Sequence, residues 1–101
     1  MAEVRECFSI TEAVTIEDLK FSERGKVQGH IEDGFFDLDC KLPVQPDGGL
    51  KCFGHPIGAS VMRMIYEMYK YLQSKAGPRQ IKDTRLELTH NLGGSTDGCM
   101  I

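Results

Sequence analysis

A long amphipathic helix constrains this chain more than any other feature of its sequence. Apolar residues recur every three or four positions after Pro56, at Ile57, Val61, Met64, Ile65, Met68 and Leu72. Pro56 suits a first helical turn, because its missing N–H needs no partner there, and Gly77-Pro78 supplies a stop. The pattern predicts a helix of about twenty residues, roughly 30 Å long, whose methionines fill a core.

Segments with a period of two predict a sheet for that helix to pack on. Residues 86–92 alternate apolar and polar side chains, and residues 99–101, after the Asp97-Gly98 turn, predict the start of a further strand. Residues 3–8 predict the end of a strand. Residues 36–44 also alternate but contain Pro43, which favours an edge strand or an extended loop.

A shorter helix is predicted to begin at Ser9. The run Ser9-Ile10-Thr11-Glu12 matches a capping box, and the helix should end before Ser22. Its expected apolar face consists of Ile10, Ala13, Val14 and Leu19. Helices and strands together predict an α/β fold, in which helices pack on a mixed sheet.

Length and charge exclude several classes of protein. The 101 residues suffice for one domain, residues 1–101. The formal net charge of -3 argues against a partner of nucleic acid or of anionic membrane. Apolar runs are far shorter than the ~20 residues of a membrane span, and residues 1–5 are too charged for a secretory signal. We therefore expect a cytosolic or organellar protein and take the cytoplasm as our prediction.

The four cysteines leave three interpretations open. They are Cys7, Cys40, Cys52 and Cys99. Without a signal peptide we expect reduced thiols, although a secreted chain could form two disulfides from them. Cys52 and His55 stand three apart, with Cys40 upstream and His90 downstream, which would allow a zinc site; no second close pair completes the usual pattern, so we expect no metal.

His55 is the most informative candidate for chemistry. It lies between glycine-rich breaks and the helix predicted to start at Pro56. Unpaired N–H groups and the helix dipole at that end would disfavour the imidazolium form, and a neutral ring can accept a proton from a thiol. The alternative is that His55 merely caps the helix.

Three segments resemble one enzyme family. Residues 48–60, Gly-Gly-Leu-Lys-Cys-Phe-Gly-His-Pro-Ile-Gly-Ala-Ser, resemble the Gly-His-Pro-x-Gly-Ala-Ser/Thr signature of the C-terminal half of thiolases. Residues 3–8 resemble the His-Asp-Cys-Phe segment of sterol-carrier-protein-type thiolases, and residues 90–94 resemble their last glycine-rich motif. The resemblance covers nearly the whole chain and implies the partial C-terminal half of a three-layer thiolase-like domain.

The resemblance also implies an activity and a site. Such a chain would be part of an acyl-CoA thiolase, an acetyl-CoA acyltransferase that catalyses Claisen condensation or thiolysis. His55 would activate a nucleophilic cysteine and contribute to an oxyanion hole, and Cys7 would be the acid/base, unless it is a plain buried thiol. Asn91, Gly93 and Gly94 would belong to the substrate pocket. Coenzyme A enters as a thioester substrate, so no cofactor is expected.

Some residues at the predicted site differ from the family pattern. Arg5 stands where the family has histidine, Glu6 replaces aspartate, and Val61 replaces a small residue. Asn91 stands where other thiolases place their acid/base cysteine, which leaves Cys7 as the candidate.

The family's nucleophilic cysteine and coenzyme A loop domain lie in an N-terminal half, and the C-terminal half should extend beyond both ends of this chain. We therefore expect no activity from the chain alone, and either a homo-oligomer or a separate N-terminal thiolase chain as partner. The alternative is a thiolase-like binding or structural module without catalysis.

Overall fold

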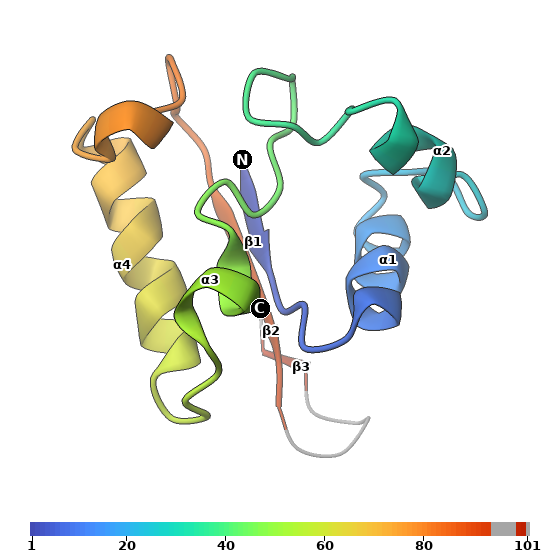
Figure 1. The fold of residues 1–101 in the computed structure, drawn as a ribbon, viewed down its shortest axis with the longest axis horizontal. Coiled ribbons are helices and arrows are strands. Elements are labelled where there is room, and N and C mark those ends of the chain that lie inside the picture. Colours follow the sequence, from blue (N-terminus) through green and yellow to red (C-terminus); the bar gives the residue numbers. More distant parts are fainter. Residues whose placement is uncertain (94–98, 101) are drawn as a thin grey trace.

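A three-stranded sheet lies between helices in the computed structural model, which describes residues 1–93 and 99–100 (Figure 1). Strand β1 (Ala2–Val4) pairs in parallel with β2 (Leu88–Leu92), and β2 pairs antiparallel with β3 (Cys99–Met100). This arrangement confirms the predicted mixed sheet of an α/β fold. The Asp97-Gly98 turn and Ile101 lie outside the described residues.

Helices cover both faces of this sheet. On one side lies α1 (Ser9–Asp18), followed by the short α2 (Val27–Glu32); α4 (Ser60–Leu72) lies on the other side (Figure 1). The remaining helices are α3 (Gly49–Phe53) and the 3-10 turn η1 (Gly77–Arg79). Within the described residues, no helix is long and apolar enough to cross a membrane.

Each face of the sheet is covered by one layer of helices. Ala2 and Val4 are fully buried, and Val4 lies opposite His90 on β2. Glu3 points to the opposite face, toward Arg63 of α4, because successive strand residues alternate sides. The buried face of α4 consists of Ser60, Met64, Glu67, Met68 and Tyr71.

The long helix is shorter than the sequence predicts. It begins at Ser60, not at Pro56, and has 13 residues. The carbonyl of Pro56 accepts hydrogen bonds from the amides of Ala59 (2.8 Å) and Ser60 (3.0 Å), so Pro56 starts a turn that leads into the helix. Ile57 is 83% exposed, and α3 is an additional short helix that we did not predict.

Two other local predictions are wrong in part. Residues 36–44 form turns instead of a strand, and only Val44 reaches the sheet, as an isolated bridge to Ala2 beside β1. Helix α1 does begin at Ser9, but its N-cap is Phe8 and no side chain caps it, so the capping box is absent. Its buried residues are Thr15 and Ile16, whereas Ile10 and Val14 are exposed.

Candidate functional site

The parallel pair β1 and β2 brings two predicted site segments to one edge of the sheet. Parallel strands end at the same edge, and Val4 lies opposite His90, so Arg5 to Cys7 leave β1 where Asn91 to Gly93 end β2. Open α/β sheets place their sites at this carboxyl edge. Asn91 also pairs with Met100 of β3. Gly94, the third predicted pocket residue, lies outside the described residues.

His55 joins this edge through Arg5. The ring lies in the loop between α3 and α4, where Arg5 Nη2 is 3.1 Å from His55 Nε2 and Ser60 Oγ is 2.7 Å from His55 Nδ1. His55 precedes α4 by five residues along the chain, but its ring contacts Ser60, the first residue of that helix, so the ring lies at the helix start as predicted. His55 is not the N-cap itself, which is Ala59.

Glu6 fixes the glycine-rich segment that precedes His55. Its carboxylate accepts a hydrogen bond from the amide of Leu50. Gly49 has a φ of +56°, and a Cβ there would collide with the same carboxylate unless Glu6 moved, so glycine is favoured at this position. The segment after β1 is thereby tied to the start of α3.

Gln45 supports the outer edge of β1. Its side-chain carbonyl accepts from the amide of Val4 at 3.3 Å, and its side-chain amide donates to the carbonyl of Val4. The backbone amide of Gln45 also donates to the carbonyl of Ala2 at 3.0 Å. The short β1 therefore has hydrogen-bond partners on both sides, although residues 36–44 form no strand beside it.

A comparison with protein families matches residues 1–100 of this sequence to the family described as thiolase C-terminal domain-like. The chain belongs to the thiolase family. It is 41% identical to an acetyl-CoA acetyltransferase of Methanothermobacter thermautotrophicus over 95 residues, which cover 94% of this chain and 25% of the relative. It is 34% identical to sterol carrier protein 2 of Bos taurus over 91 residues, which cover 90% of this chain and 17% of the relative.

A second archaeal acetyl-CoA acetyltransferase, from Methanocaldococcus jannaschii, is 33% identical over 95 residues, which cover 92% of this chain and 24% of the relative. The thiolase chain described here thus spans a quarter or less of the length of these relatives.

Cys7 lies between β1 and α1 in this thiolase domain. It is a free, half-buried thiol, two residues beyond Arg5 and two before the start of α1. Cys40 and Cys52 are free and exposed. In the described part of the chain, no three histidine, cysteine, aspartate or glutamate side chains are placed so that they could hold a metal ion, so the zinc alternative finds no ligand set there.

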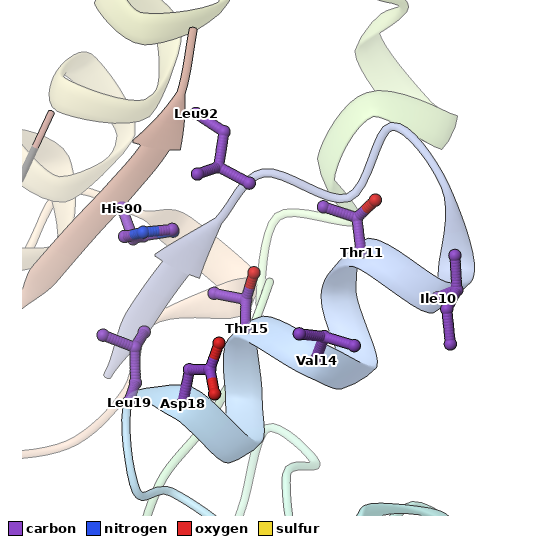
Figure 2. A pocket seen from close by; sticks show the side chains of 8 residues that line it. All are labelled: Ile10, Thr11, Val14, Thr15, Asp18, Leu19, His90 and Leu92. Atoms are coloured by element: carbon purple, nitrogen blue, oxygen red, sulfur yellow. The ribbon is translucent and has the colours of Figure 1, made fainter. Parts of the chain in front are cut away.

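An apolar cavity of about 550 Å³ opens between α1 and β2 (Figure 2). Figure 2 shows the eight side chains that line it: Ile10, Thr11, Val14, Thr15, Asp18, Leu19, His90 and Leu92. His90 is 7% exposed, and burial lowers its pKa. Neither the predicted catalytic residues nor Asn91 and Gly93 line this cavity, although its volume is in the range of small-molecule sites.

A buried ion cluster beneath the site was not predicted from the sequence. The guanidinium of Arg63, on α4, contacts the carboxylate of Asp47, and its Nη2 lies 3.6 Å from Glu3 Oε2. Asp47 also accepts from the amide of Gly49 at 2.7 Å, so the cluster reaches the glycine-rich segment. Two features of the sequence could have indicated this cluster: Glu3 stands between the apolar residues of β1, and Arg63 stands in the amphipathic helix α4.

Burial controls the protonation of Glu3. Its side chain is fully buried, and desolvation raises its pKa to about 8, despite the opposing charge of Arg63. Glu6 and Glu67 add to the increase. At neutral pH the carboxyl group of Glu3 therefore keeps its proton.

Stability is expected to fall as pH rises from 4.5 to about 8, because the folded chain then holds a proton on Glu3 that the unfolded chain has released. The free energy of unfolding loses up to about 1.4 kcal/mol per pH unit. Burial raises the pKa of Glu87 to about 7, so Glu87 also lowers stability as pH rises, between 4.5 and about 7. Burial lowers the pKa of His90, so this residue has the opposite effect: stability rises with pH up to its ordinary pKa of 6.5.

Between about pH 7 and about pH 8 the decrease comes mainly from Glu3, with a smaller part from Glu87, and urea unfolding at these two pH values measures it. The variant Glu3→Gln should remove most of the decrease between these two conditions. Glu23→Gln, at an exposed position, is the matched control and should leave it in place. An equal decrease in Glu3→Gln would refute the raised pKa.

Proposed function

We propose that this chain is the C-terminal part of an acyl-CoA thiolase that catalyses Claisen condensation or thiolysis, acting in the cytoplasm with an N-terminal thiolase half. The placement of His55 carries the proposal. Its imidazole is held between Arg5 and Ser60 at the sheet edge from which Cys7 extends. Contacts at both nitrogens fix the orientation of the ring, and the thiol two residues beyond Arg5 supplies a group that can exchange protons.

The proposed reaction divides the work between the two halves. In condensation, Cys7 as thiolate removes a proton from the α-carbon of acetyl-CoA. The resulting carbanion attacks the acyl thioester carried by the nucleophilic cysteine of the N-terminal half, whose thiolate leaves. The proton that Cys7 took from the α-carbon then passes by way of His55 to this thiolate, which restores Cys7 as thiolate. Asn91, Gly93 and Gly94 would contact the substrate, and coenzyme A takes part only as its thioester or thiol.

Helix α4 supports a partner on its outer side. Its apolar residues fall on two faces: one packs on the sheet, and the other is exposed. The exposed side chains are Met62, Ile65, Tyr66, Tyr69 and Leu72, which are 50 to 64% exposed. Large apolar side chains gathered on one exposed face are typical of an interaction surface. The N-terminal thiolase half would cover this second face.

A chimera tests the proposed function. Residues 1–101 replace the matched quarter of the Methanothermobacter acetyltransferase, and thiolysis of acetoacetyl-CoA is measured. We expect turnover from the chimera and none from the 101-residue chain alone. Cys7→Ala should abolish the turnover, whereas Cys52→Ala, at an exposed thiol, should retain it. Turnover by the isolated chain would mean that it carries a nucleophile of its own.

A non-catalytic thiolase-like module is the second candidate. The observation in its favour is that Arg5 occupies His55 Nε2, which leaves neither ring nitrogen free. A chimera that folds and assembles like the natural acetyltransferase, yet shows no thiolysis, would favour this function.

The isolated chain is expected to self-associate through the outer face of α4, since large exposed apolar patches promote pairing. Light scattering should give the mass of a dimer or a larger species. Ile65→Lys should shift the chain to the monomer, whereas Leu86→Lys, at an 83% exposed leucine just before β2, should not. A wild-type chain that remains monomeric at high concentration would contradict the partner argument.

A further inference from the structure

Arg5 determines which nitrogen of the His55 ring can carry a proton. A guanidinium has N–H donors and no acceptor, and Arg5 Nη2 lies 3.1 Å from His55 Nε2. While this exposed contact is made, His55 Nε2 accepts the hydrogen bond, which it can do only without a proton. A proton on Nε2 would bring two donors face to face, and a doubly protonated ring would place two cations in contact.

The other ring nitrogen completes a chain of hydrogen bonds that runs in one direction. With Nε2 unprotonated, the neutral ring carries its proton on Nδ1 and donates it to Ser60 Oγ, 2.7 Å away. The hydroxyl of Ser60 donates in turn to the carbonyl of Pro56 at 3.1 Å. Ser60 is 3% exposed at the start of α4, so its hydroxyl is held in place for this role.

We propose that Arg5 is a positioning residue that holds His55 as the Nδ1–H tautomer, with Nε2 as a hydrogen-bond acceptor. The catalytic consequence rests on the proposed function. In a working thiolase site, Nε2 in this form cannot donate a hydrogen bond to an oxyanion, and it can take up a proton only when the Arg5 N–H has moved off it. Arg5, which stands where the family has histidine, therefore has to release Nε2 before His55 can transfer a proton.

Nitrogen NMR of the ¹⁵N-labelled 101-residue chain tests the tautomer directly. At about pH 8, well above the ordinary histidine pKa of about 6.5, the ring nitrogens of a neutral histidine show which one carries the proton. We expect a protonated Nδ1 and an unprotonated Nε2 for His55, assigned with His55→Gln. Arg5→Met should shift the ring toward the Nε2–H tautomer that predominates in free histidine, and Arg5→Lys should restore the wild-type pattern.

His30 provides an internal control, because its Nδ1 contacts Ser22 Oγ at 2.9 Å and its ring stacks on Phe35, away from Arg5. Its signals should be the same in every variant. If they change in Arg5→Met, the fold has been disturbed, and the wild-type and Arg5→Lys spectra decide the question. An Nε2–H tautomer in the wild type, or an unchanged tautomer in a folded Arg5→Met, would overturn the inference.

The two proposals can fail separately. An Nδ1–H tautomer together with an inactive, folded chimera would leave the role of Arg5 intact and refute the proposed function. An active chimera whose His55 carries its proton on Nε2 would do the reverse.

Discussion

His55→Ala is expected to lower thiolysis by the chimera at least about a hundredfold, because a positioned acid–base group contributes roughly 10²- to 10⁴-fold to turnover. The substitution removes the ring that Arg5 and Ser60 orient at the carboxyl edge of the sheet. Since His55 is exposed in a loop, alanine there should leave the fold and the assembly of the chimera unchanged. Steady-state kinetics at saturating acetoacetyl-CoA and coenzyme A measure the effect on kcat.

His30→Ala is the control for this prediction. His30 lies on α2, beyond α1, and its side chain contacts Ser22 and Phe35. We expect this variant to keep most of the turnover of the chimera. A His55→Ala chimera that retains a comparable rate would remove His55 from the catalytic machinery and leave the family fold without its proposed chemistry.

The elements that could be predicted from the sequence are those set by local signals. Residues 88–92 alternate and form β2, and Ser9 starts α1 as expected. Pro56 was misleading because proline favours both a first helical turn and an ordinary turn, and the following residues decide which one forms. In residues 36–44 the alternation of apolar and polar residues did not correspond to one buried and one exposed face. Phe36 is buried, but Cys40, which the pattern places on the same face, is exposed like the aspartates.

The site required both the resemblance and the fold. His55 and Cys7 were identified from contiguous motifs, but the contact between Arg5 and His55 joins residues 50 positions apart. Such a contact depends on how β1 is placed relative to the loop before α4, which no local pattern encodes. The same applies to the ion cluster: Arg63 meets Asp47 and Glu3 only after α4 has packed on the sheet.

Arg63→Met is expected to lower the free energy of unfolding by about 3 kcal/mol, since removing one partner of a buried ion pair leaves an uncompensated charge. The Arg63 side chain is 15% exposed, and those of Asp47 and Glu3 are fully buried. Methionine preserves the unbranched shape, so the effect reports the lost charge more than a cavity. Urea unfolding at about pH 7 measures it. Arg24→Met, in an ion pair whose side chains are 79% and 59% exposed, is the matched control and should cost less than about 1 kcal/mol.

The carboxylate that needs Arg63 can be identified with double variants. Glu3, with a pKa of about 8, is mostly neutral at pH 7, so the charge that Arg63 compensates belongs to Asp47. Asp47→Asn should therefore recover most of the stability lost in Arg63→Met, and Glu3→Gln should recover little. Full recovery by Glu3→Gln instead would show that Glu3 is ionised in the folded chain. Because Asp47 also binds the amide of Gly49, its ion pair with Arg63 connects the stability of α4 to the glycine-rich segment that leads to His55.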